Sequence, residues 1–125
     1  MLVAIKRTVS HAPSLRFEAM ALSILGARYD LSLVMCGDAL AQQMNARYRR
    51  RKYSPNVLSF PYGKREGEIF LNVRKAEREA RQMGTSSKAR LAILFVHGCF
   101  HLKGHRHSAT MERLERAVLR KFGFV

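Results

Sequence analysis

Apolar residues recur at two spacings along the chain, and each spacing predicts a different kind of element. Alternation at period two, typical of a strand, runs from Tyr29 to Met35. Alternation or β-branched content also predicts three further strands, at Met1–Val9, Asn56–Phe60 and Glu68–Leu71. Because a proline and glycines separate the last two, we expect a hairpin-like or bent connection between them.

Apolar residues at helical spacing, bounded by capping residues, predict five helices. They are Pro13–Leu25, a helix that begins at Asp38 and runs into Arg49–Lys52, Asn72–Met83, a helix that begins at Ser86 or Ser87, and Met111–Phe122. On the last helix, Leu114, Val118 and Leu119 are expected to face inward. Because strands and helices interleave, the predicted fold class is α+β (mixed α/β), with about four strands packed by about five helices.

Length and composition predict a single domain covering residues 1–125. With 47% hydrophobic and 26% charged residues, the chain has the balance of a globular protein with one core. Two cysteines are too few for a disulfide scaffold and suggest a reducing compartment. The longest apolar run, Leu91–Val96, is far shorter than the roughly 20 residues of a membrane span. The first ten residues do not resemble an export signal, so we expect a cytoplasmic protein without a membrane segment.

Charge is the first feature that points to a partner. The chain has 23 Lys and Arg against 9 Asp and Glu, a formal net charge of +14. Such a charge attracts polyanions by long-range electrostatics and counterion release, which favours RNA or DNA as the partner. Charge by itself does not distinguish a binding protein from an enzyme.

Three histidines in the segment HGCFHLKGHRH have the spacing of metal ligands. His97 and His101 are four residues apart, so a helix places their rings one above the other, where both can bind one ion. A helix continued to His105 would rise by about 12 Å, too far for its ring to share that ion. Gly104 can end the helix in the left-handed conformation, so that His107 returns to the metal. His105 competes with His107 as the third ligand, and the geometry favours His107 without deciding.

Three neutral imidazoles suit Zn²⁺ with a fourth position open to water, which is a catalytic arrangement, and the sequence does not distinguish zinc from nickel or manganese. Cys99 lies on a different side of the helix from His97 and is expected to pack in the core. The metzincin proteases have the related pattern H-E-x-x-H-x-x-G-x-x-H, but Gly98 stands here where they carry the glutamate general base. A protease is therefore disfavoured, whereas a metal and a cation can stabilise the cleavage of a phosphodiester.

The histidine segment also resembles the signature H-G-x-L-H-L-x-G-Y-D-H of the YbeY family of bacterial rRNA maturation endoribonucleases. Upstream, MNARYRRRKYSPNVLSFP is similar to the family's L-N-x-x-Y-R block followed by N/D-V-L-S-F-P, and GEIFLN is similar to its G-D-I strand. Downstream, Met111, Glu115 and Leu119 are similar to the family's closing helix.

This resemblance implies a metalloprotein with a zincin-like histidine-bearing helix, in which His97, His101 and His107 hold one Zn²⁺ ion. It also implies that Arg49 lines the active-site cleft and handles the substrate. A guanidinium suits that task, because it can bind a phosphate through two parallel hydrogen bonds. The implied partner is ribosomal RNA, in the ribosome or its precursors, and no small-molecule substrate is implied.

One departure from the family pattern bears on the metal site. His105-Arg106 replace the family's Tyr-Asp before the last histidine. A carboxylate that could orient a ligand imidazole is therefore missing there or supplied from elsewhere in the fold. Arg106 could instead add a contact to phosphate.

We hypothesise a zinc-dependent, single-strand endoribonuclease that matures the 3′ end of the small-subunit rRNA and contributes to ribosome quality control. Either hydroxide or the RNA 2′-OH is compatible as the nucleophile. The main alternative is a non-catalytic, basic rRNA-binding assembly factor with a structural metal. A protease or other small hydrolase is a weaker third option.

Overall fold

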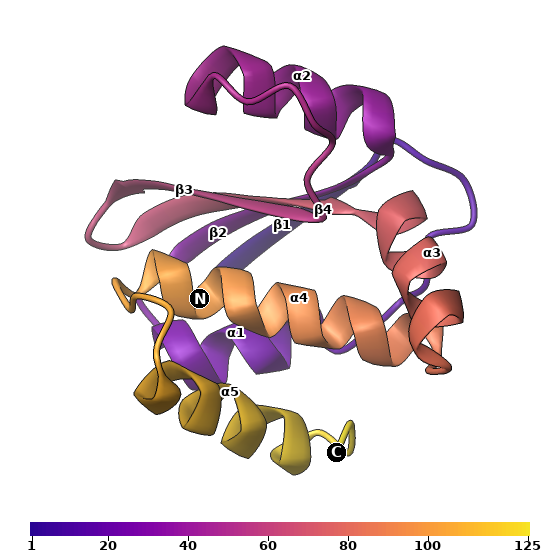
Figure 1. Ribbon diagram of the computed structural model, residues 1–125. Coiled ribbons are helices and arrows are strands. Elements are labelled where there is room, and N and C mark those ends of the chain that lie inside the picture. The colour runs from indigo at the N-terminus through magenta and orange to yellow at the C-terminus, as the bar shows by residue number, and fades with distance from the viewer.

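The computed structural model describes residues 1–125 and contains one four-stranded sheet and five α-helices (Figure 1). In chain order the elements are β1 (Leu2–Arg7), α1 (Phe17–Leu25), β2 (Asp30–Cys36), α2 (Asp38–Arg49), β3 (Val57–Gly63), β4 (Glu66–Asn72), α3 (Val73–Met83), α4 (Ser87–Leu102) and α5 (Ala109–Lys121). The strand order is β1-β2-β4-β3, with β1, β2 and β4 parallel and β3 antiparallel to β4. The predicted α+β class, with about four strands and five helices, is confirmed.

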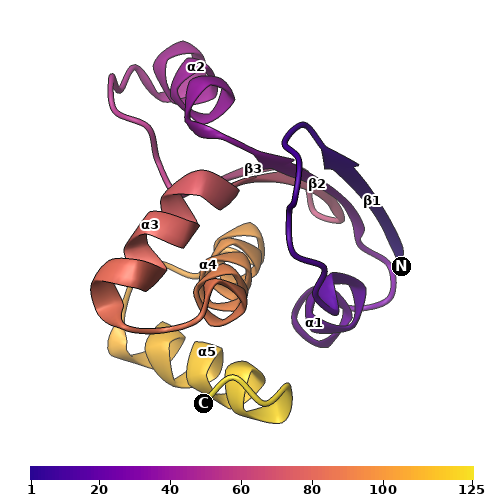
Figure 2. The ribbon, with the colours of Figure 1, turned by 90° about the vertical axis from the view of Figure 1, so that its right-hand side faces the viewer.

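Helices cover both faces of the sheet (Figure 1). Helix α2 lies alone on one face, whereas α1 and α4 lie on the other, with α5 outside α4. Figure 2 shows α3 beside α4. The period-two pattern of β2 explains these layers, because Leu31 and Leu33 enter the large core with α1 and α4, while Val34 and Cys36 enter a smaller cluster under α2.

Helix α4 runs through the centre of the molecule and is buried on most of its surface. It begins where the Ser86 hydroxyl accepts a hydrogen bond from the Ala89 N–H at 3.1 Å. It ends at Leu102, and Gly104 follows with a φ of 102°. The predicted glycine bend after the helix is confirmed. The chain therefore turns toward α5 just after α4 ends. This turn brings His107 close to the histidines at the end of the helix.

The predicted start of α1 is wrong, whereas α2 begins at Asp38 as predicted but is not capped by the Asp38 side chain. Helix α1 begins at Phe17 rather than at Pro13, because its buried face begins at Phe17, which packs edge-on against Phe95 at 4.9 Å between ring centroids. At α2 the capping position is Gly37, and no side chain caps the helix. Asp38 is already in the helix, and its carboxylate instead accepts hydrogen bonds from Arg78.

The inward face of α5 also differs from the prediction. Met111 and Leu119 are buried and Val118 is half-buried, but Leu114 is 38% exposed. The buried stripe follows positions 111, 115, 118, 119 and 122, so Leu114 falls at its margin.

Strands β3 and β4 are longer than predicted and form an antiparallel hairpin, the first of the two connections expected between them. Pro61 is tolerated because β3 is an edge strand. None of the five helices is long and apolar enough to cross a lipid bilayer.

Candidate active site

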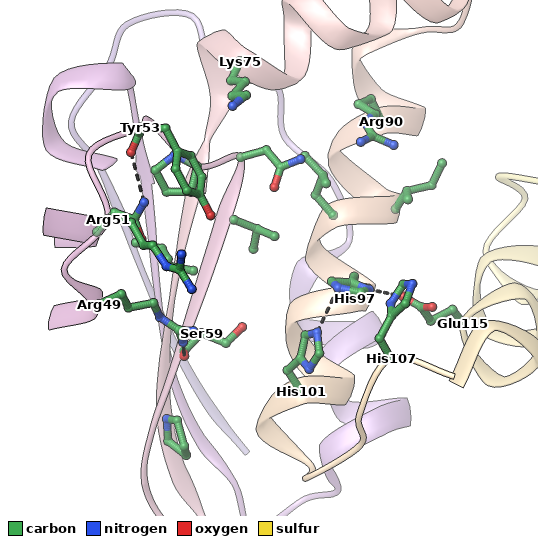
Figure 3. Close-up of a pocket in the computed structure, with 18 of the residues that line it drawn as sticks. Arg49, Arg51, Tyr53, Ser59, Lys75, Arg90, His97, His101, His107 and Glu115 are labelled. Atoms are coloured by element: carbon green, nitrogen blue, oxygen red, sulfur yellow. Dashed lines mark hydrogen bonds and ion pairs between the residues drawn. The ribbon is translucent and has the colours of Figure 1, made fainter. Parts of the chain in front are cut away.

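A cleft of about 880 Å³ opens between α4 and the segment that joins α2 to β3 (Figure 3). Apart from Lys75 of α3, its labelled side chains lie on two walls: Arg49, Arg51, Tyr53 and Ser59 on one, and Arg90, His97, His101, His107 and Glu115 on the other. Lysine and arginine supply four of the lining residues, whereas Glu112 and Glu115 are the acidic ones. The cleft therefore combines imidazoles with an excess of cations, which suits an anionic substrate.

The imidazoles of the α4 wall come from the one stripe of the helix that the core leaves open. Arg90, Ile93, His97 and His101 are half-buried, follow each other at spacings of three and four residues, and all line the cleft. The prediction that the two histidine rings lie one above the other on α4 is confirmed. Their Nε2 atoms lie 2.9 Å apart, and their rings are nearly perpendicular, with centroids 4.4 Å apart.

Each of these two rings is held through its other nitrogen. His97 Nδ1 lies 2.7 Å from a carboxylate oxygen of Glu115 on α5. His101 Nδ1 lies 3.1 Å from the backbone carbonyl oxygen of His105, which can only accept a hydrogen bond. These contacts orient both rings so that their Nε2 atoms point toward one another. Partners of this kind fix the tautomer and direction of metal-binding histidines.

The same contacts test whether the pair can hold a metal ion. If Nδ1 of each ring donates a proton, both Nε2 atoms carry lone pairs, and two lone pairs at 2.9 Å repel unless a cation lies between them. Burial and the neighbouring His97 lower the pKa of His101, which favours the neutral imidazole that a metal binds. The donor chemistry of His97 and His101 therefore fits Zn²⁺, which binds imidazole nitrogen at about 2.0–2.1 Å.

Of the two candidates for third ligand, His107 faces the cleft. Its ring centroid lies 5.6 Å from that of His97. The His105 ring instead packs edge-on against Phe100, also at 5.6 Å. As they stand, no three His, Cys, Asp or Glu side chains are close enough together to bind one ion. A three-histidine site therefore needs a shift of His107, which lies on the short loop between α4 and α5.

Arg49, the last residue of α2, extends across the sheet edge into the same cleft. Its Nη2 donates a hydrogen bond to the Ser59 carbonyl oxygen at 2.8 Å, and its guanidinium carbon lies 5.4 Å from the centroid of the Phe60 ring. The Ser59 hydroxyl in turn donates to the Gly98 carbonyl oxygen of α4 at 3.1 Å. These two bonds link the arginine of one wall to the histidine helix of the other.

Gly98 explains why no glutamate follows the first histidine. A Cβ atom built at Gly98 would lie 3.0 Å from Ser59 Oγ, 3.2 Å from Ile69 Cδ1 and 3.3 Å from Val57 Cγ2. Helix α4 therefore approaches the sheet too closely for a longer side chain. Cys99, next along the helix, is fully buried in the core as predicted, and burial raises the pKa of its thiol. Neither residue supplies a general base or a metal ligand.

Glu115 is the site residue whose contact the sequence did not reveal. No spacing rule connects it to His97, because the two lie on different helices and 18 residues apart. A signal was available, since Glu115 lies midway between Met111 and Leu119 on the apolar face of α5, where an unpaired carboxylate is costly. Glu115 thus provides, from α5, a carboxylate partner for His97 rather than for His107.

The family model described as Endoribonuclease YbeY matches residues 4–123. The chain is 37% identical over 103 residues to the endoribonuclease YbeY of Polynucleobacter asymbioticus, covering 75% of this chain and 66% of the relative. It is 33% identical over 121 residues to that of Pseudomonas putida, covering 86% of this chain and 77% of the relative. The chain thus spans only about two thirds to three quarters of the length of these relatives.

A solved structure supports the fold independently. The solution structure of a Thermotoga maritima protein aligns with a TM-score of 0.72 and 19% sequence identity. The alignment covers 97% of this chain and 89% of the other.

Proposed function

The chain belongs to the YbeY family of endoribonucleases, and from this premise we propose that it is a zinc-dependent endoribonuclease acting on single-stranded ribosomal RNA. The proposed roles are maturation of the 3′ end of the small-subunit rRNA and ribosome quality control. The substrate and partner are ribosomal RNA in the ribosome or its precursors, in the cytoplasm. The net charge of +14 supports a polyanionic partner.

One observation carries this proposal. The Nε2 atoms of His97 and His101 lie 2.9 Å apart on α4, and a guanidinium lies on the opposite wall of the same cleft. A cation site facing an arginine is suited to a phosphodiester, because its negative charge increases as the bond to phosphorus rearranges. A peptide carbonyl would need a general base, and Gly98 leaves no room for one beside His97.

The residues that would hold the metal are His97, His101 and His107. Zn²⁺ bound there supplies a Lewis acid and a water of lowered pKa. Glu115 and the His105 carbonyl keep the His97 and His101 rings turned toward the cleft.

Arg49 binds and orients the phosphate. Only Nη2 of its guanidinium is used in the bond to Ser59, so donors remain for two phosphate oxygens. The anchored side chain has less rotational freedom to lose when the substrate binds.

Metal dependence can be tested with purified protein and a fluorescent single-stranded RNA. We expect the zinc-loaded protein to cleave this RNA, a chelator to abolish cleavage and added zinc to restore it. The variant His101→Ala, purified in parallel, controls for contaminating nuclease and should be inactive with a lowered zinc content. Cleavage that persists after metal removal, or that is equal in His101→Ala, would contradict the proposed activity. Tight RNA binding with zinc bound but no cleavage would instead support the non-catalytic assembly factor.

A further inference from the structure

We propose that Tyr53 and Arg51 form a subsite for one unpaired nucleotide, whose base stacks on the Tyr53 ring while its phosphate binds Arg51. This subsite rests on the proposed function, because it takes the same RNA strand that Arg49 and the histidines would act on. It lies on the wall of the cleft opposite His97 (Figure 3).

Tyr53 presents an aromatic ring that is largely open to solvent. The residue is 60% exposed, yet it lines the cleft, and no protein atom forms a hydrogen bond with its hydroxyl group. The aromatic residues of the core, such as Phe17 and Phe95, are almost fully buried. An exposed aromatic ring beside cations is the usual platform for an unpaired base.

The backbone that carries Tyr53 is held in place from both sides. Asn45, which is 1% exposed, donates from Nδ2 to the Tyr53 carbonyl oxygen at 3.0 Å. The N–H of Arg51 donates to the Asn45 carbonyl oxygen at 3.2 Å, and the hydroxyl of Ser54 donates to the Asp38 carbonyl oxygen at 3.1 Å. The backbone from Arg51 to Ser54 is therefore anchored to α2, which fixes where the Tyr53 side chain leaves the chain before any ligand binds.

The turn at Arg50, between α2 and Arg51, also directs this segment along the cleft. Arg50 has a φ of 55°, in the left-handed region that non-glycine residues seldom occupy. Its N–H donates to the Asn45 carbonyl oxygen and so ends α2. A residue held in this region by surrounding contacts turns the chain so that Arg51 and Tyr53 follow Arg49 along the cleft.

The charges around Tyr53 suit a nucleotide. The Lys75 ammonium lies 5.7 Å from the centroid of the ring and donates to the Ser54 carbonyl oxygen at 2.6 Å. On the other wall, the Arg90 guanidinium already forms an ion pair with Glu79 at 3.0 Å. Arg51 is exposed and forms no side-chain hydrogen bond or ion pair with the protein. Among the cations that line the cleft, Arg51 is thus the one nearest in sequence to Tyr53 that is free to bind a phosphate.

A stacking subsite also predicts strand selectivity. The face of a base is accessible only when the base is unpaired and unstacked, because neighbouring base pairs cover both faces within a duplex. Tyr53 should therefore strengthen the binding of single-stranded RNA and leave duplex binding unchanged. Arg51 should strengthen the binding of both through the phosphate.

The experiment measures binding rather than cleavage. Fluorescence anisotropy with a labelled single-stranded oligoribonucleotide, in chelator so that the RNA stays intact, compares the whole chain with Tyr53→Leu and Tyr53→Phe. Tyr48→Leu is the matched control, since Tyr48 is 56% exposed on α2 but does not line the cleft. We expect Tyr53→Leu to weaken binding roughly 5- to 150-fold. Tyr53→Phe should stay within about 2-fold of wild type, because the ring is kept, and Tyr48→Leu should be unchanged.

A duplex of the same sequence and an oligonucleotide containing 2-aminopurine complete the test. Tyr53→Leu should leave duplex binding unchanged, and the 2-aminopurine fluorescence that wild type quenches should not be quenched by this variant. Equal single-strand binding by Tyr53→Leu and wild type would overturn the subsite, whether or not the protein cleaves RNA. An equal loss on duplex RNA would also overturn it. Tyr53-dependent binding without cleavage would leave the subsite intact and refute only the nuclease activity.

Discussion

The carboxylate of Glu115 lies 2.7 Å from Nδ1 of His97, so that helix α5 determines which way the first histidine of α4 faces. The side chains are only 14% and 26% exposed, respectively. A contact that is this short and partly shielded orients the imidazole and makes its Nε2 a stronger donor to a metal.

Replacement of Glu115 should therefore weaken metal binding without unfolding the protein. We expect Glu115→Gln to lower zinc affinity by roughly 10- to 100-fold, measured by competition with a chromogenic chelator. Glu112→Gln is the control, because Glu112 lines the same cleft but forms no bond with a histidine. Equal zinc affinity in Glu115→Gln and wild type would show that the contact does not act on the metal.

Replacement of Arg49 should separate substrate handling from metal binding. We expect Arg49→Ala to lower the rate of RNA cleavage by roughly 10²- to 10³-fold, as loss of a charge-stabilising donor does in other enzymes. Its zinc content by elemental analysis should match wild type, because Arg49 contacts Ser59 and Phe60 rather than a histidine. Arg47→Ala, at an arginine of the same helix outside the cleft, should cleave normally. Normal cleavage by Arg49→Ala would show that Arg49 does not bind or orient the substrate.

The close approach of α4 to the sheet should make Gly98 sensitive to even one methyl group. Overpacking costs about 1–3 kcal/mol, and the higher helix propensity of alanine offsets up to about 1 kcal/mol. We expect Gly98→Ala to lower the free energy of unfolding by about 1 kcal/mol, measured by urea denaturation. In Gly63→Ala the added Cβ meets no atom within 4 Å, so its stability should not change. A higher free energy of unfolding in Gly98→Ala than in wild type would mean that the Ser59 side chain moves aside at little cost.

Asp38 should make folding stability depend on pH in the acid range. Hydrogen bonds from Arg78 and Asn72 lower the pKa of its carboxyl from 3.8 to about 2. Because the folded state binds the proton less readily than the unfolded state, the stabilisation is complete above about pH 4 and is lost as the pH falls toward 2. Since the Arg78–Asp38 pair is solvent-exposed, we expect its contribution to be about 1 kcal/mol or less.

The variant Asp38→Asn should show a smaller loss of stability between pH 4 and pH 2 than wild type, measured by thermal or urea unfolding. Asp30→Asn, at an exposed carboxylate without an ion pair, is the control and should follow wild type. Parallel curves for Asp38→Asn and wild type would contradict this assignment.

Local patterns were enough to predict most of the elements and the core of the candidate site. The spacing of His97 and His101, and the bend at Gly104, depend on helix geometry and on glycine's backbone freedom, which act within a few residues. For the same reason the alternation from Tyr29 to Met35 correctly predicted strand β2. The prediction of the α1 start at Pro13 was wrong, because burial of Phe17 set the boundary.

Only the tertiary structure decided which distant side chains meet. Glu115 reaches His97 because α5 packs back on α4, and Arg49 faces the histidines because Ser59 bonds to both walls. The path of the short loop between α4 and α5 places the His105 ring against Phe100 and the His107 ring in the cleft. The spacing of the histidines in the sequence could not distinguish these two positions. Such contacts depend on the packing of whole helices against the sheet, a property of the folded chain and not of any local run of residues.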